Sequence, residues 1–131
     1  MFFDIDPHNG IPIYDQVMRQ IKFAIAQGVL RPGDRIPSVR DLAKELVVNP
    51  NTIARSYQGL QAEGILAANR GIGLEVAKGA RAECQRQRKA LVRERLMQVI
   101  SEARQSGLDE DAIERLYRQC LAETSTRSVS Q

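Results

Sequence analysis

The sequence has 131 residues but only one histidine and two cysteines, and no apolar run long enough to cross a bilayer. Cys84 and Cys120 lie far apart and form no CxxC pair, so a zinc site is not expected. The acidic N-terminus lacks the basic and long apolar parts of a secretory signal. We therefore expect a cytoplasmic protein with reduced thiols and no membrane partner.

Residue patterns typical of enzymes are also missing. The histidine, His8, lies in an N-terminal turn region, and its neighbours Asp4, Asp6 and Asp15 show no metal-ligand spacing. The Gly71-Ile72-Gly73 stretch does not link a strand to a helix, as a phosphate loop would. We expect no catalytic residue, no metal and no cofactor.

Glycine and proline are unevenly distributed. Residues 1–79 contain eight of the nine glycines and all five prolines, whereas residues 80–131 contain only Gly107. With 43% hydrophobic and 27% charged residues, the composition is that of a globular protein with a core. We expect a turn-rich domain over residues 1–79, a helical region over 80–122 and a disordered tail over 123–131.

Three helices are expected in the first region. Apolar residues at helical spacing predict a helix over about residues 12–27, which Gly28 ends. Ser38 can cap a short second helix that ends near residues 47–48. Asn49 and Pro50 are suited to the N-cap and first position of a third helix.

The third helix has two different faces. The inward face is expected to contain Ile53, Tyr57 and Leu60, and the opposite face Asn51, Arg55, Gln58 and Ala62. Two short strand candidates follow at residues 65–68 and 74–77, joined by a glycine-containing loop. This order predicts a mainly α (α+β) fold, a winged helix-turn-helix domain with a two-helix C-terminal appendage.

The polar face of the third helix is the candidate DNA reader. Asn and Gln side chains can pair with adenine edges and Arg with guanine. On an isolated helix the same residues would be an ordinary solvated face. Their position between a helix-turn pair and a hairpin wing favours DNA binding.

Several motifs, all within residues 9–77, resemble the GntR family of bacterial transcription regulators. They are Pro12-Ile13-Tyr14-Asp15-Gln16-Val17, Arg31-Pro32-Gly33-Asp34, Pro37-Ser38-Val39-Arg40, Asn49-Pro50-Asn51-Thr52, Glu63-Gly64 and Arg70-Gly71-Ile72-Gly73. The Asn-Pro-Asn-Thr helix start and the short C-terminus are most similar to the YtrA-like subfamily. The resemblance implies a homodimer that binds a near-palindromic double-stranded DNA operator, and more often a repressor than an activator.

The resemblance also implies which residues contact DNA. They are Arg40 in the second helix, Asn49, Asn51, Thr52 and Arg55 at the recognition helix, and Arg70 and Gly71 at the wing tip. Pro50 and Ala54 stand where better-known members carry guanine-reading arginines. The operator sequence therefore cannot be transferred, and the effector is unknown.

The C-terminal region is predicted to form one long helix over residues 80–105 and another capped by Asp109. We expect their apolar stripes to form the dimer interface, with contributions from Leu96, Val99, Ile100, Ile113, Leu116 and Tyr117. The basic run over residues 81–95 could follow DNA phosphates or flank the dimer seam, the second being the more usual arrangement. Cys84 lies in a basic setting that could lower its thiol pKa, but a redox-sensing role is the less favoured interpretation. Cys120 is expected to pack as a small apolar residue.

Two functions remain open at this point. The favoured one is a sequence-specific DNA-binding transcription regulator. The alternative is a winged-helix module that binds another protein and no DNA. An exposed surface containing Arg40, Arg55 and Arg70 would favour the first, and an exposed apolar patch there the second.

Overall fold

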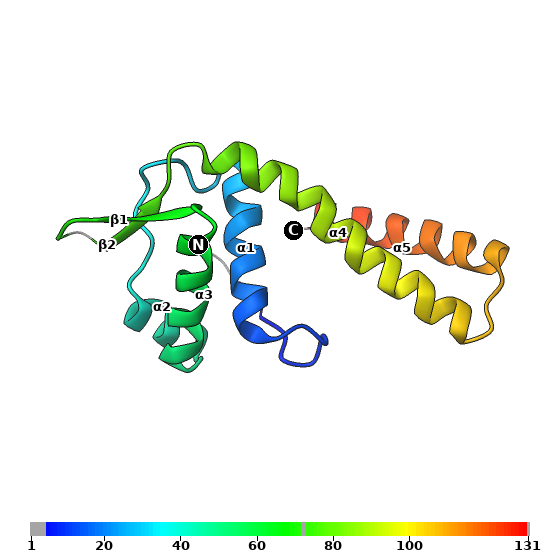
Figure 1. The fold of residues 1–131 in the computed structure, drawn as a ribbon. Helices are drawn as coiled ribbons and strands as arrows, with labels where there is room; N and C mark the ends of the chain where they lie inside the picture. The colour runs from blue at the N-terminus through cyan, green and yellow to red at the C-terminus, as the bar shows by residue number, and fades with distance from the viewer. Residues whose placement is uncertain (1–4, 72, 131) are drawn as a thin grey trace. The chain divides into compact units, whose positions relative to one another are not determined.

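The structure is a computed structural model that describes the backbone of residues 5–71 and 73–130 (Figure 1). Its elements are α1 (Ile13–Gln27), α2 (Val39–Leu46), α3 (Pro50–Ala62), β1 (Leu66–Asn69), β2 (Gly73–Val76), α4 (Ala80–Gln105) and α5 (Glu110–Ser130). Asp4 and Ile72, which entered the sequence argument, lie outside the described residues. The predicted fold class, mainly α with a two-stranded hairpin, is confirmed. The chain divides into two compact units, Met1–Ala90 and Leu91–Gln131.

The predicted helix boundaries in the first unit are accurate because the capping residues set them. Pro12 precedes α1, and Gly28 ends it in the left-handed conformation with φ of 85°. The hydroxyl of Ser38 accepts a hydrogen bond of 3.0 Å from the backbone N–H of Asp41 at the start of α2. The Asn49 side chain accepts one of 2.8 Å from the N–H of Asn51 at the start of α3.

The core of the first unit lies between α1, α2, α3 and the hairpin. Its fully buried side chains include Val17, Ile21, Ile25, Leu42, Ile53, Leu60, Ile65 and Val76. At the contact of α1 with α3, the Met18 side chain packs over Gly59, where an added Cβ would lie 2.8 Å from Met18 Cε and would displace that flexible methyl group.

The hairpin is shifted by one residue from the prediction. Leu66 pairs with Val76 and Asn69 with Gly73. Ile65 had been expected to begin the first strand, but its N–H donates to the Leu60 carbonyl oxygen at the end of α3. The segment before α2 lies along β2, where the Ile36 N–H donates 2.9 Å to the Leu74 carbonyl oxygen.

A buried glutamine attaches the N-terminal segment to α1. Gln16 is 3% exposed, and its side chain donates to the backbone oxygens of Asp6 and Ile11 at 2.7 and 2.8 Å. Its amide oxygen accepts a hydrogen bond of 3.0 Å from the Asp6 N–H. The N-terminal segment, which the sequence analysis placed in a turn region, is therefore held against α1 by this side chain.

The long helix α4 contributes to both units. Ala80 and Cys84, in its first two turns, are buried in the core of the first unit. The sequence had placed the boundary between residues 79 and 80, whereas the two compact units divide between residues 90 and 91. A change in glycine and proline content marks where the long helix begins, which need not be where a core ends.

The helix α5 begins as predicted, with the Asp109 side chain accepting 2.8 Å from the Ala112 N–H. It continues to Ser130, whereas the sequence predicted a disordered tail from residue 123. The Thr124 hydroxyl donates to the helix carbonyl of Leu121 at 2.9 Å, so the polar side chain bonds within the helix. Extending a formed helix adds a hydrogen bond for each residue fixed, so polar composition alone does not end it.

Candidate nucleic-acid interface

The orientation of α3 is fixed by the side chains on its inner face. Ile53 and Leu60 are fully buried, and Tyr57 is 3% exposed. The Tyr57 hydroxyl donates a hydrogen bond of 2.7 Å to the carbonyl oxygen of Pro37, just before α2. Burial raises the pKa of the Tyr57 phenol above its ordinary value, and the nearby Glu45 carboxylate raises it further. The phenol therefore remains a hydrogen-bond donor that links α3 to the segment leading into α2.

The outer face of α3 carries the polar residues that the sequence placed there. Asn51, Arg55 and Gln58 are exposed, and Thr52 is half-buried. Asn51, Thr52 and Arg55 line an open recess of about 370 Å³ together with Ile13 and Tyr14 of α1. The structure thus brings together three of the predicted recognition residues.

The other predicted DNA-contact residues lie on different elements of the first unit. Arg40 is exposed near the start of α2, and Asn49 is exposed directly before α3. Arg70 and Gly71 are exposed in the turn between β1 and β2, where Gly71 has φ of 74°. None of the ion pairs found among the described residues involves Arg40 or Arg70. Both guanidinium groups are therefore available to an anionic partner.

Arg55 has an aromatic partner that the sequence did not predict. Its Cζ lies 3.7 Å from the centroid of the Tyr14 ring, within the range of a cation–π contact. Tyr14 belongs to the apolar pattern that predicted α1, and that pattern gives it no partner. Helical spacing places Tyr14 near the core side of α1, but it carries no information on which residue of α3 lies opposite.

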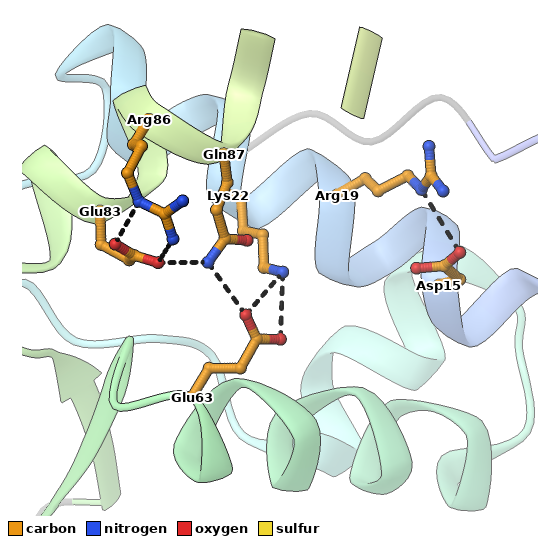
Figure 2. A network of polar contacts seen from close by, with 7 residues as sticks. All are labelled: Asp15, Arg19, Lys22, Glu63, Glu83, Arg86 and Gln87. Atoms are coloured by element: carbon orange, nitrogen blue, oxygen red, sulfur yellow. Dashed lines mark hydrogen bonds and ion pairs between the residues drawn. The ribbon is translucent and has the colours of Figure 1, made fainter. Parts of the chain in front are cut away.

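A polar network connects α1, the end of α3 and the start of α4 (Figure 2). Lys22 Nζ donates to the two carboxylate oxygens of Glu63 at 2.9 and 3.0 Å. Gln87 donates to Glu63 at 3.2 Å and to Glu83 at 2.8 Å, and Arg86 forms an ion pair with Glu83. Hydrogen bonds from Arg86 and Gln87 lower the pKa of Glu83 to about 2. We call these five residues the α4 anchor network.

The α4 anchor network was also missed by the sequence argument. Lys22 and Glu63 are 41 residues apart, and Glu63 and Gln87 are 24 apart, so no local spacing rule relates them. The one available signal was a lysine within the apolar pattern of α1. Lys22 is only 7% exposed, and a lysine this buried requires a partner.

The two cysteines have opposite environments. Cys84 is fully buried in the first unit, and burial raises the pKa of its thiol to about 11. The structure thus also disfavours a thiolate sensor at Cys84, because the basic residues near it in sequence do not offset desolvation. Cys120 is exposed on α5 in the single chain, not packed as expected from its apolar neighbours.

The predicted dimerisation residues all lie in the second unit. Leu96, Val99, Leu116 and Tyr117 are each about half exposed, at 45–53%, and Ile100 and Ile113 are partly buried. Val92, Met97 and Leu121 add further exposed apolar surface. Within one chain these side chains are therefore incompletely covered.

In residues 5–71 and 73–130, no group of three or more His, Cys, Asp and Glu side chains could hold a metal ion. No helix in the same part of the chain has the length and apolar character needed to span a membrane.

Comparison with known proteins gives consistent matches. Residues 13–76 match the family described as bacterial regulatory proteins, gntR family. The HTH-type transcriptional repressor YtrA of Bacillus subtilis is 33% identical over 91% of this chain and 92% of its own length.

Two solved structures are informative. YtrA from Sulfolobus acidocaldarius, a GntR-family transcription factor, has a TM-score of 0.56 and 32% identity, covering 94% of this chain and 99% of that one. The AraR DBD in complex with operator ORX1 has a TM-score of 0.50 and 30% identity, covering 59% of this chain and 93% of that one.

Proposed function

Since the chain belongs to the GntR family and is therefore a DNA-binding transcription regulator, we propose that it is a cytoplasmic, homodimeric repressor of a near-palindromic operator. The observation that carries the proposal is the exposed polar face of α3, opposite the buried Ile53, Tyr57 and Leu60. An amide and guanidinium face at the start of such a helix suits major-groove recognition. The relative solved with operator ORX1 supports DNA as the partner.

We assign different roles to the DNA-contact residues. Asn51 and Arg55 read base edges, with Asn49 and Thr52 beside them at the start of α3. Arg40 contacts the phosphate backbone and sets the register of the domain. Arg70 and Gly71 place the wing toward the minor groove. The residues of the winged domain, about 1–79, thus bind DNA, and those of the helical region, about 80–122, join two copies.

Homodimerisation is supported by the exposed apolar residues of the second unit. A two-fold symmetric dimer presents two recognition helices to two half-sites, which is how helix-turn-helix proteins commonly reach sufficient affinity. Leu96, Val99, Ile100, Ile113, Leu116 and Tyr117 are proposed as interface residues.

The proposal is tested by selection of bound DNA from a randomised duplex library. The wild-type chain should enrich an inverted repeat. Arg55→Ala should relax the preference at one base pair in each half-site, at mirror-related positions, by about 1–3 kcal/mol of discrimination. A chain that enriches no sequence would support the protein-binding alternative.

The backbone contacts are tested by affinity as a function of salt. Arg40→Ala and Arg70→Ala should each weaken operator binding and reduce the slope of log affinity against log salt by about 1, with an unchanged melting temperature. Arg118→Ala, which removes an exposed arginine of α5, is the matched control. Equal binding by wild type and the Arg40→Ala/Arg70→Ala double variant at physiological salt would refute the assignment.

A further inference from the structure

The contact between Arg55 and Tyr14 joins the proposed DNA-reading residue to a different helix. Tyr14 lies in the first turn of α1, and Arg55 lies in the second turn of α3. The guanidinium carbon is 3.7 Å from the ring centroid, so the positive charge lies against the negative face of the ring. Tyr14 is half-buried and Arg55 is exposed, so the ring is the less mobile of the two groups.

The position of Tyr14 is itself fixed by α3. The fully buried Ser56 hydroxyl lies 2.8 Å from the Tyr14 carbonyl oxygen and 3.0 Å from that of Thr52, and it donates to these helix carbonyls. Ser56 directly follows Arg55 in the sequence. The backbone that carries the ring is therefore held next to the residue whose side chain the ring contacts.

Contact with the ring leaves the donors of Arg55 available. A guanidinium group is planar, and its five N–H groups lie in that plane. A ring packed against the face of the plane does not occupy these donors. The adjoining recess, which Asn51 and Thr52 also line, is open to a base edge or a phosphate.

We propose that Tyr14 is a positioning residue for operator recognition, which orients the Arg55 guanidinium before DNA binds. The inference rests on the proposed function, in which Arg55 reads a base. An arginine held in one orientation loses less conformational freedom on binding and adapts less easily to a wrong base. Tyr14 thus sharpens the preference at the base pair that Arg55 contacts without itself contacting the base.

The test uses two substitutions in the full chain. Tyr14→Phe keeps the ring face and removes the hydroxyl, and Tyr14→Leu keeps apolar bulk and removes the ring. In selection from the randomised library, Tyr14→Phe should retain the wild-type preference. Tyr14→Leu should relax the preference by about two- to five-fold, the range of an exposed cation–π contact, at the base pair that Arg55→Ala affects.

A second measurement checks the contact in free protein. In NMR spectra without DNA, the ring should shift the Arg55 Nε–H proton resonance in wild type and in Tyr14→Phe, and the shift should be absent in Tyr14→Leu. Equal resonances in all three proteins would overturn the proposal. Melting temperatures of the variants should stay near wild type, and adding Tyr14→Leu to Arg55→Ala should cause no further loss of preference.

The outcomes separate the positioning role from the function on which it rests. A wild type that enriches no sequence would overturn both. If wild type selects an operator and Arg55→Ala relaxes one base pair, the function stands. Uniform loss of affinity in Tyr14→Leu, or equal losses in Tyr14→Phe and Tyr14→Leu, would then overturn only the positioning role. Equal losses would indicate a phosphate contact by the Tyr14 hydroxyl.

Discussion

The two units of the chain differ in how far their apolar residues are buried. Every buried hydrophobic residue among those described lies between Val17 and Cys84, in the first unit. The second unit instead exposes Val92, Leu96, Met97, Val99, Leu108, Leu116, Tyr117 and Leu121. The first unit thus has a core of its own, whereas the second leaves its apolar stripes uncovered in a single chain. Exposed apolar surface of this kind is typical of an interaction site.

This difference fits the proposal that one chain both binds DNA and forms a homodimer, each through a different unit. The first unit, called the winged unit below, can present exposed polar side chains because its fold does not depend on them. The second unit is called the helical unit. We propose that the exposed apolar residues of the helical unit are buried against those of a second copy, as in obligate dimers. The α4 anchor network lies where the long helix leaves the winged unit, with Lys22, Glu63, Glu83 and Gln87 holding its first turns.

The largest expected effect is on assembly. Leu116→Asp places a charge on the proposed interface, where desolvation would cost several kcal/mol. We expect a monomer of 14.7 kDa in light scattering, with the melting transition of the winged unit retained. Gln119→Asp, on an exposed position of the same helix, should remain dimeric. An unchanged mass for Leu116→Asp would show that the units associate in another way.

Thiol reactivity provides a second test of the difference between the two units, since each unit contains one cysteine. Cys120 lies four residues after Leu116 on the same face of α5, so the proposed dimer interface should cover it. We therefore expect Cys120 to react slowly with a thiol reagent in wild type and rapidly in Leu116→Asp. Cys84 should stay unreactive in both at pH 8, since it is buried and its thiol pKa is raised to about 11. Because the thiol pKa is higher when folded, the stability it contributes is present below pH 9 and falls as the pH rises toward 11.

A smaller effect is expected in the α4 anchor network, where two substitutions should differ. Glu63→Ala leaves the buried Lys22 ammonium without its carboxylate and should lower the free energy of unfolding by about 1–2 kcal/mol, after discounting for the partly exposed Glu63. Lys22→Met removes the buried charge and leaves a solvated carboxylate, so it should be nearly neutral. Urea denaturation measures both. Equal decreases in the free energy of unfolding would mean that loss of the ion pair, rather than the unpaired buried charge of Lys22, causes the destabilisation.

The smallest effect concerns the turn before the recognition helix. Val47 has φ of 55° and is 90% exposed, a left-handed conformation that is strained for a β-branched residue. Val47→Gly should raise the free energy of unfolding by less than about 1 kcal/mol, because relief of strain exceeds the added entropy of the unfolded chain. The neighbouring Val48 packs on the core at negative φ, so Val48→Gly should destabilise. Thermal denaturation of the two glycine variants should shift in opposite directions.

Sequence patterns predicted the fold of the winged unit well because its determinants are local. Ser38, Asn49 and Gly28 mark helix ends by their own chemistry. The predicted strand boundary at Ile65 was off by one residue, since the Ile65 N–H donates to a carbonyl oxygen of α3 rather than to the sheet. The helix α5 continues to Ser130 although the sequence is polar there, because local polarity does not report whether a helix continues, and the tail over residues 123–131 stays a prediction.

The site was predicted less completely. The outer face of α3 follows from helical spacing, and the structure exposes Asn51 and Arg55 as expected. The partner of Arg55 depends on how α1 crosses α3, which no pattern within either helix specifies. The pairing of Lys22 with Glu63 likewise depends on tertiary packing. The roles of Arg40 and Arg70 stay predictions that DNA binding must test.

The central claim is that two chains, joined through the helical unit, read one operator. The most direct measurement is the number of chains bound to a duplex carrying the selected sequence, obtained by native mass spectrometry. We predict two chains, adding twice 14.7 kDa to the mass of the duplex, with no appreciable population of a singly bound complex. A complex with one chain per duplex at full affinity would contradict the account.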